Sequence, residues 1–571
     1  MVIEADAQSQ IRSEQTGDEM RHWSRWDTLA LLLFGATVAL ELIWHDPWAD
    51  EAQAWLIARS MGFWQIIRHG VRYESSPALW HCFLHLLILL HVSYSGMAWV
   101  TGAMAVAGIT IFLRWSPFPP VLRVLLPLTF WLAYQDAVIA RSYVLFTPLG
   151  FAAAALLRNR VRRPILIAVI LALCTNLSLH GLVAAFGLAV IVGVQAGRKH
   201  RLRNASRLWR RPAWIVAGLI LAASTALAVY SAFPPPDDSS PTAENLARSM
   251  EKITAKLHGR RLPAAGRLSH PVNMRPDQLV RMPYPRHHRT PLESLQAEMG
   301  RALGAITFPL SDVGLYGLLL FGALCWLAFR TPAMERLGTA GAGPLGLPGL
   351  VPYLSLVIVF SRMYLAPRHC GMMMMGFLIS LWLVWPASSQ PPTRALKIIT
   401  TLLIVMSVEQ IGWTAHALLA SRETPSDPGV ATAAYLRQYP EATVDGFYYH
   451  SVDVLPYFSH NIYTNQSSPY WLWSKRPHTD PDAPSAIAKH PDVIVVGGFT
   501  WSRHNSAVDD DWNKPDASLN SIPDEDSYRI VPYAEAHGYR ITHVFCGDQF
   551  MRFGYSEQAC NIILQPAAAT Q

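Results

Sequence analysis

Apolar runs separated by short polar segments constrain this chain more than any other feature of its sequence. Such recurring runs predict membrane helices, although several are shorter than the roughly 20 residues of a simple span. Only 15% of the 571 residues are charged, whereas about a quarter is usual in soluble domains. No secretory cleavage site follows the first run, so we expect it to be retained. The runs lie at about 27–44, 77–92, 96–113, 119–134, 142–157, 164–179, 181–196, 213–233, 313–329, 346–361, 370–386 and 397–419.

Arginine clusters between the runs set the expected orientation. Four arginines lie within 158–163, and seven arginines and lysines lie within 198–211 with no acid among them. Basic residues in short loops mark the cytoplasmic side of membrane proteins. We therefore attribute the net charge of +7 to membrane topology and not to binding of nucleic acid.

Counting membrane crossings back from these two arginine clusters to the N-terminus indicates that one apolar run does not cross the membrane. If every run crossed, the N-terminus would fall on the side opposite to the clusters. The run 77–92 is short, begins at Pro77 and carries three histidines, so we predict that it lies in the membrane interface. About eleven helices then span the bilayer, with residues 1–26 in the cytoplasm. The segments expected on the outer face are 45–95, 135–141, the turn near His180, the long loop 234–312, and 362–369.

The region 420–571 differs in character from the transmembrane region 27–419. The segments 491–499 and 540–547 have the apolar, β-branched pattern of strands, and 429–440 has the pattern of a short amphipathic helix. The sequence therefore predicts a polytopic α-helical membrane protein with a small extracytoplasmic α/β domain at its C-terminus.

Two cysteines lie in that C-terminal region, Cys546 and Cys560. A domain outside the cytoplasm meets an oxidising environment, in which disulfides form and persist. We predict a disulfide between them, with two buried thiols as the alternative.

The stretch WHDPWADEAQAWLIARS, residues 44–60, places adjacent acids beside the first membrane helix. Asp46 followed by Pro47 predicts a helix start, with Asp46 as the N-cap. Asp50 and Glu51 then lie in the first turns, near the positive end of the helix dipole. Stabilising the helix start is one explanation for these acids, and chemistry at the membrane surface is the other.

Other outer segments also carry ionisable residues at helix ends. Arginines there oppose the positive-inside bias, and several arginines near an acid pair indicate a site that binds an anionic group beside a base. The simpler interpretation is that a lone arginine anchors lipid headgroups and that a lone histidine packs. The candidate residues are Glu74, Arg141, Tyr143, His180, Arg362, Tyr364, Arg368 and His369.

The ordered motifs DE, YESSPALW, ARSY and RH resemble those of the GT-C glycosyltransferases. The most similar subgroup is the protein O-mannosyltransferase and lipid A aminoarabinose-transferase type, and the resemblance covers about residues 27–420. It implies that Asp50, with Glu51 beside it, is the catalytic acid of the first outer loop. It matches Arg141 and Tyr143 to the R-x-Y motif. It also implies a polyprenyl-phosphate-linked sugar as the donor.

The expected reaction is a single, inverting displacement on the extracytoplasmic side. A carboxylate takes the proton from a hydroxyl of a lipid, glycan or protein acceptor, and arginines stabilise the departing phosphate. Glu51 could assist Asp50, or the two acids could hold a divalent cation; the sequence leaves both open. The expected location is the bacterial inner membrane.

Two other classes of function compete with this interpretation. A lipid or glycan transporter or flippase predicts ionisable residues at mid-membrane and inverted repeats. A non-catalytic membrane scaffold predicts no convergence of acids with arginines. Whether Asp50, Arg141 and Arg368 meet in space therefore separates the scaffold from the enzyme.

Overall fold

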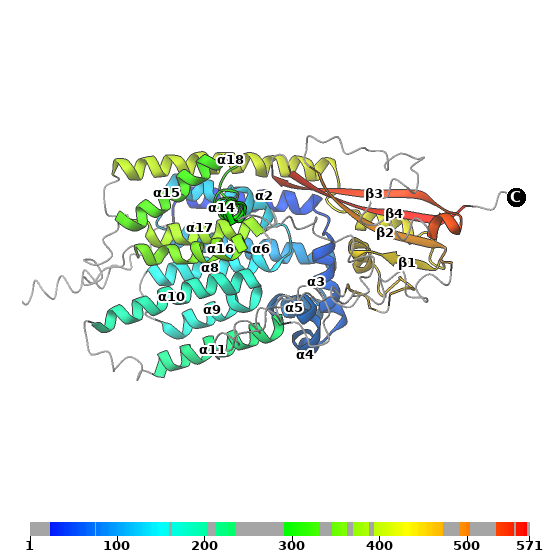
Figure 1. Ribbon diagram of the computed structural model, residues 1–571, viewed down its shortest axis with the longest axis horizontal. Coiled ribbons are helices and arrows are strands. Elements are labelled where there is room, and N and C mark those ends of the chain that lie inside the picture. The colour runs from blue at the N-terminus through cyan, green and yellow to red at the C-terminus, as the bar shows by residue number, and fades with distance from the viewer. Residues whose placement is uncertain are drawn as a thin grey trace, which may run out of the picture.

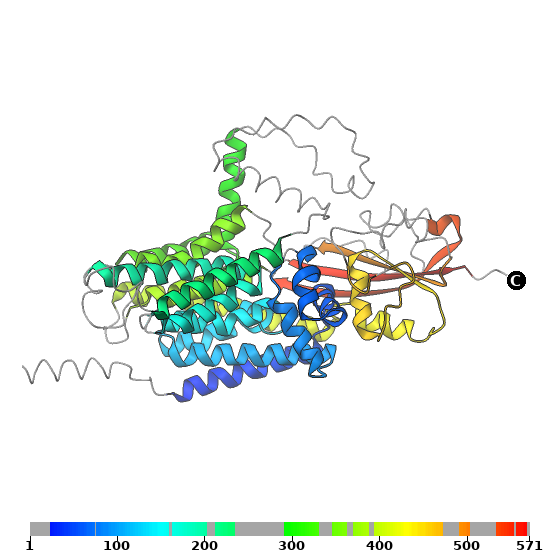
Figure 2. The ribbon, with the colours of Figure 1, turned by 90° about the horizontal axis from the view of Figure 1, so that it is seen from below.

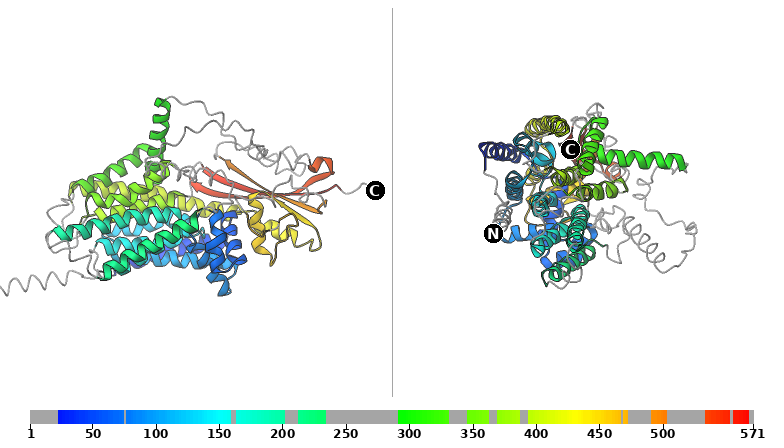
Figure 3. Two further views of the ribbon diagram at one scale, coloured as in Figure 1. Left: turned by 60° about the horizontal axis from the view of Figure 1, so that its bottom comes forward. Right: turned by 90° about the vertical axis from the view of Figure 1, so that its left-hand side faces the viewer.

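The computed structural model shows a bundle of helices with a small β-sheet at one end (Figure 1). In Figures 1 and 3 most bundle helices run side by side along the long axis of the molecule. The structure describes residues 23–74, 76–158, 163–201, 212–233, 291–330, 345–362, 369–386, 393–466, 468–471, 490–502, 533–552 and 555–567.

The long helices of the bundle correspond to most of the apolar runs. They are α2 (Arg25–Trp44), α6 (Tyr94–Trp115), α8 (Ser142–Arg158), α9 (Pro164–Leu177), α10 (Leu179–Arg201), α11 (Pro212–Ala232), α15 (Gly314–Arg330), α16 (Val351–Arg362, preceded by η6, Leu347–Leu350), α17 (Cys370–Val384) and α18 (Arg394–Glu423).

Four of these helices, α2, α6, α11 and α18, are long and apolar enough to cross a membrane. Their outward faces carry large aliphatic side chains: Leu32 is 66% exposed and Leu219 is 64% exposed. Apolar side chains exposed in this way along many helices are unfavourable in water and favourable in lipid. The bundle is therefore compatible with a membrane protein.

The run 119–134 does not form the single helix that we expected. It is divided into α7 (Pro120–Leu125), η3 (Leu126–Leu128) and η4 (Trp131–Gln135). Pro127 cannot donate a backbone hydrogen bond, which interrupts the α-helical pattern after α7. The helical backbone then ends at Thr129, which has an extended conformation. The carbonyl of Thr129 then accepts the amides of Leu132 and Ala133, which starts the next turn.

Short helices cover the end of the bundle that faces the sheet, which we call the sheet end. The run 77–92 contributes α5, whose 11 residues extend about 16 Å and are too few to cross a bilayer of ~30 Å. The other short elements here are α3 (Ala49–Ser60), α4 (Phe63–Gln65), η1 (Ile66–Gly70) and η2 (Val71–Glu74), and α5 itself is Leu79–Leu89.

One helix occupies part of the segment expected as a long loop. The helix α14 (Pro291–Thr307) stands across the direction of the bundle in Figure 2 and packs on α15 and α16. Residues 234–290 of that loop lie outside the described residues.

Two arginines, Arg123 and Arg158, organise the opposite end of the bundle. Arg123 forms a buried ion pair with Asp27 at the start of α2, with 2.5 Å between nitrogen and oxygen. Arg158, at the end of α8, donates to the carbonyls of Trp382 and Trp385 at the end of α17, at 2.6 and 2.8 Å. These contacts fix the start of α2 and the end of α8 at the end of the bundle opposite the sheet end.

The sheet has the strand order β1-β2-β4-β3, with β1 parallel to β2 and the other pairs antiparallel. The predicted strands at 491–499 and 540–547 and the predicted helix at 429–440 are confirmed. Ile494, Val496, Ile562 and Leu564 form the apolar face of the two central strands. The elements are α19 (Gly429–Leu436), β1 (Val444–Phe447), η8 (Tyr449–Tyr457), β2 (Val493–Ser502), β3 (Tyr539–Arg552) and β4 (Tyr555–Pro566).

Cys546 and Cys560 form a disulfide. They face each other directly in the register of β3 and β4, where side chains of opposite residues approach closely. The bridge therefore fixes the pairing of these two strands, and β4 is central in the sheet.

Replacing both cysteines by alanine should destabilise the sheet. The two cysteines are 14 residues apart in the sequence, and losing a disulfide that closes so short a loop is expected to lower the free energy of unfolding by about 2–3 kcal/mol. Proteolysis of the full chain across a urea gradient, with cleavage followed by mass spectrometry at residues 539–566, measures this loss. Cys325→Ala is the control, because Cys325 is a free, partly buried thiol in α15. Equal urea midpoints for the double variant and the wild type would contradict the prediction.

Candidate functional site

Asp50 and Arg141 meet at the sheet end of the bundle, as the sequence motifs predict. Asp50 is the second residue of α3, and Arg141 lies between η4 and α8. Arg141 Nη1 forms an ion pair with Asp50 Oδ2. Tyr449, the first residue of η8, donates its hydroxyl to Asp50 Oδ1 at 2.5 Å. Two parts of the bundle and one part of the sheet region thus converge on one carboxylate.

The guanidinium of Arg141 lies between two aromatic rings. It is 5.9 Å from the ring centroid of Trp48 and 5.9 Å from that of Tyr143. Burial alone lowers the pKa of Arg141, but the Asp50 carboxylate outweighs this and raises the pKa above its usual value. Arg141 is therefore a permanent, oriented cation whose side chain is still 24% exposed.

Glu51 differs from its neighbour because its oxygens bind the backbone. It is fully buried, and its carboxylate accepts the amide of Ala140 at 2.6 Å and that of Trp48 at 3.1 Å. His45 Nε2 lies 3.0 Å from the same carboxylate. Glu51 therefore ties the end of α2 and the start of α3 to the segment that carries Arg141.

The expected helix start at Asp46 is wrong by a few residues. The helix α3 begins at Ala49, with Trp48 as its N-cap and the Glu51 carboxylate on the Trp48 amide. The Asp46 amide donates instead to the Ser426 hydroxyl at 3.0 Å. Asp46 therefore lies in the contact between the bundle and the sheet region.

The two adjacent carboxylates contact different groups: Asp50 contacts Arg141 and Tyr449, and Glu51 accepts the amides of Ala140 and Trp48. The described part of the chain contains no group of three or more His, Cys, Asp or Glu side chains placed to hold a metal ion.

The predicted residues Tyr143, His180 and His369 form an aromatic cluster beside Arg141. The His180 ring stacks on Phe360 with centroids 4.7 Å apart and lies 4.7 Å from the His369 ring. Tyr143 lies edge-on to His180 at 5.6 Å. The sheet ends of α8, α10, α16 and α17 thus meet here.

Glu74 joins the same end of the bundle through Gln53 of α3. The Gln53 amide donates to Glu74 Oε1 at 2.7 Å and to the Trp471 carbonyl at 2.6 Å. The Trp471 amide donates back to Gln53 Oε1 at 2.8 Å. Gln53 therefore connects Glu74 of η2 to the backbone of Trp471 in the sheet region.

Three predicted residues cannot be placed in the site. Arg362 ends α16, but its side chain is outside what the structure describes. Tyr364 and Arg368 lie outside the described residues, so the meeting of Arg368 with Asp50 stays a prediction.

The sequence did not point to three further polar residues of this region, namely Tyr449, His81 and Asp136. Burial, reinforced by the charge of Arg141, lowers the pKa of His81 to about 3, so its imidazole is neutral at neutral pH. Asp136 is 1% exposed, and its carboxylate has no hydrogen-bond partner among the described residues. It lies against Gly371, where a β-carbon would come within 2.4 Å of Oδ1. None of the three belongs to a recognisable motif.

A buried acid pair lies between the bundle and the sheet. Asp453 accepts the Asn561 amide at 2.9 Å, and Asp427 accepts the Gly429 amide at 2.9 Å. Burial raises the pKa of Asp453 to about 7. Burial and then the charge of Asp453 raise the pKa of Asp427 well above its usual range. The pair therefore holds protons at a pH where exposed carboxyls have lost them.

Comparisons with protein-family models, with curated proteins and with solved structures find no match for this chain. The resemblance to the GT-C glycosyltransferases therefore remains a prediction that depends on short sequence motifs.

The acid pair predicts how stability depends on pH. The folded protein keeps a proton on Asp453 that the unfolded chain releases from a pKa near 3.8. The free energy of unfolding should therefore fall as pH rises from about 4 to 7, by at most ~1.4 kcal/mol per pH unit for one proton. Asp453→Asn should flatten this slope in urea denaturation measured at several pH values.

The exposed acid Asp492 supplies the control for this experiment. Hydrogen bonds from Thr443 lower its pKa, so Asp492→Asn should leave the falling slope in place. A slope that is the same in wild type and Asp453→Asn would show that Asp453 is not the titrating group.

Proposed function

We propose that this protein is a membrane glycosyltransferase that moves a sugar from a polyprenyl-phosphate donor to an acceptor hydroxyl. The observation that carries the proposal is the ion pair of Asp50 with Arg141 at the sheet end of the bundle. An acid that can take a proton, beside an oriented cation that can bind phosphate, is the combination that this reaction needs.

The proposal includes a membrane topology. About eleven helices cross the bilayer of a bacterial inner membrane, α5 lies in the interface, and residues 1–26 are cytoplasmic. The sheet region and the site then face the extracytoplasmic side. Arg123 and Arg158 at the opposite end support this orientation, because basic residues favour the cytoplasmic side.

Asp50 is the proposed base. Its carboxylate contacts Arg141 and Tyr449, which fix its position for a hydrogen bond from an acceptor hydroxyl, and an ionised carboxylate offers about four acceptor positions in all. As that hydroxyl gives its proton to Asp50, its oxygen forms a bond to the anomeric carbon. The bond from this carbon to the phosphate oxygen breaks, and the electron pair leaves with polyprenyl phosphate. Attack opposite the leaving group inverts the anomeric configuration.

Arg141 is the proposed phosphate ligand. An arginine has five N–H donors in a planar fork, so the contact of Nη1 with Asp50 leaves other donors for phosphate oxygens. The rings of Trp48 and Tyr143 restrict the guanidinium, which reduces the entropy lost when phosphate binds. Arg141 thereby stabilises the negative charge that develops on the leaving group.

The convergence of Asp50 and Arg141 favours this function over a scaffold, for which we expected no such contact. For a transporter or flippase we expected ionisable groups at mid-membrane. The described ion pairs of arginine with an acid lie at the two ends of the bundle, Asp27 with Arg123 at one and Asp50 with Arg141 at the other. Glu409 lies midway along α18, where it accepts hydrogen bonds from Ser311 and Asp312.

Asp50→Asn is expected to lower the rate of sugar transfer by about 10²–10⁴-fold, because asparagine keeps the shape of the side chain and cannot accept the proton. Binding of the donor should stay measurable. The rate is measured as polyprenyl phosphate released by purified protein. Turnover close to wild type would reduce Asp50 to a structural partner of Arg141 and Tyr449.

Glu51→Gln is the matched control at the adjacent position. A glutamine amide cannot accept both backbone amides, so we expect a loss of about 1–3 kcal/mol in stability. Any folded fraction should lose less transfer per molecule than Asp50→Asn does, because the glutamine oxygen can still accept the Ala140 amide that positions Arg141.

Arg141→Lys tests the phosphate ligand. Lysine keeps the charge but loses the fork that donates two hydrogen bonds to phosphate. We expect transfer to slow by about tenfold or more, equivalent to ~1.4 kcal/mol of transition-state stabilisation. Arg437→Lys is the control, because Arg437 is an exposed arginine that donates to the Tyr457 carbonyl. Wild-type rate and donor affinity in Arg141→Lys would reduce Arg141 to a structural partner of Asp50.

A further inference from the structure

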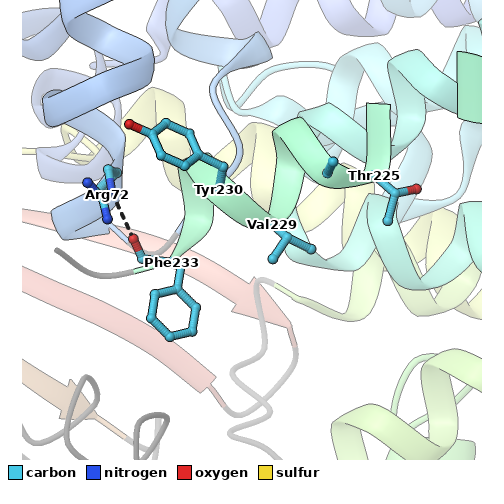
Figure 4. A pocket seen from close by; sticks show the side chains of 6 residues that line it. Arg72, Thr225, Val229, Tyr230 and Phe233 are labelled. Atoms are coloured by element: carbon cyan, nitrogen blue, oxygen red, sulfur yellow. Dashed lines mark hydrogen bonds between the residues drawn. The ribbon is translucent and has the colours of Figure 1, made fainter. Parts of the chain in front are cut away.

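A groove of about 610 Å³ lies on the surface of α11 at the sheet end (Figure 4). It is separate from Asp50 and is formed by the last turns of α11 together with η2. Its lining residues are Arg72, Thr225, Ala226, Val229, Tyr230 and Phe233.

The apolar part of the groove runs along α11 for about two turns. Thr225, Val229 and Phe233 recur at intervals of four residues and so lie on one face of the helix. Val229 is 51% exposed and Tyr230 is 47% exposed. Because α11 is one of the four helices able to cross a membrane, this face would meet hydrocarbon chains and not water.

Arg72 lies at the end of the groove in a fixed orientation. Its Nε donates to the Phe233 carbonyl at 3.0 Å, which is the dashed line in Figure 4. Its guanidinium carbon lies 5.0 Å from the centroid of the Tyr230 ring. Both contacts orient the side chain without using its two Nη groups, which form the fork that binds phosphate.

We propose that the groove binds a bilayer phospholipid, with the lipid phosphate on the Nη groups of Arg72 and one acyl chain along α11. The arginine supplies the charge that complements a phosphate, and the exposed apolar face supplies the surface for a chain. A role limited to capping the end of α11 would explain the contact with Phe233, but it would not require the adjoining apolar groove. The inference depends on α11 lying in a membrane and does not depend on sugar transfer.

The test uses the full chain in lipid nanodiscs that contain a phosphatidylglycerol with a photoactivatable acyl chain. After irradiation, mass spectrometry measures labelling of residues 225–233 relative to the exposed face of α18 near Val408, which is 58% exposed. Arg72→Gln should reduce this ratio about tenfold, because charge-assisted hydrogen bonds to phosphate are lost. Ala226→Trp should reduce it by filling the groove.

Two matched variants should leave the ratio unchanged. Arg68→Gln removes an exposed arginine that lies over Trp64, four residues before Arg72. Leu219→Trp introduces the same tryptophan two turns before Ala226, at an exposed position of α11 that does not line the groove.

Equal labelling in wild type and Arg72→Gln would overturn the proposal. Competition by polyprenyl phosphate alone, or by inorganic phosphate without any lipid, would overturn the assignment to a phospholipid. The readout contains no transfer step, so an inactive enzyme with Arg72-dependent labelling would refute the glycosyltransferase and leave the lipid site intact.

Discussion

The hydrogen bond from the Ala140 amide to the Glu51 carboxylate is the contact on which the site depends. Glu51 follows Asp50 in the chain, and Ala140 precedes Arg141. The contact between Glu51 and Ala140 therefore brings Asp50 within reach of Arg141. A carboxylate that is buried and bound to backbone amides is costly to displace. The same bond that holds α3 against the segment before α8 thus sets the distance between the proposed base and the proposed phosphate ligand.

The sheet region takes part in this arrangement through contacts with α3 and the residues just before it. Tyr449 donates to Asp50, Gln53 pairs with the backbone of Trp471, and the Ser426 hydroxyl accepts the Asp46 amide. The short helix α3, which carries the proposed base, is therefore held on one side by the bundle and on the other by the sheet region. This double support gives Asp50 a defined position at a boundary where a single helix end would be free to move.

Sequence reasoning succeeded where local pattern decides the structure. A continuous run of β-branched residues predicted the strand now seen as β2, and the R-x-Y motif led to Arg141. It failed where a contact joins distant segments. Nothing in the vicinity of Tyr449 indicates that its hydroxyl reaches Asp50, 399 residues away. The adjacent acids 50 and 51 looked equivalent until the amide of Ala140 distinguished them, and Pro127 divided a run that hydropathy alone made continuous.

The most direct test of the central claim is a transfer assay with purified protein and a panel of polyprenyl-phosphate sugars, in which release of polyprenyl phosphate is measured together with the anomeric configuration of the product. We predict release from at least one donor, only when an acceptor is present, with inversion at the anomeric carbon. A product with retained configuration would contradict a single displacement at Asp50. Intact donors across the panel, with donor binding to the protein still measurable, would contradict the assignment as a glycosyltransferase.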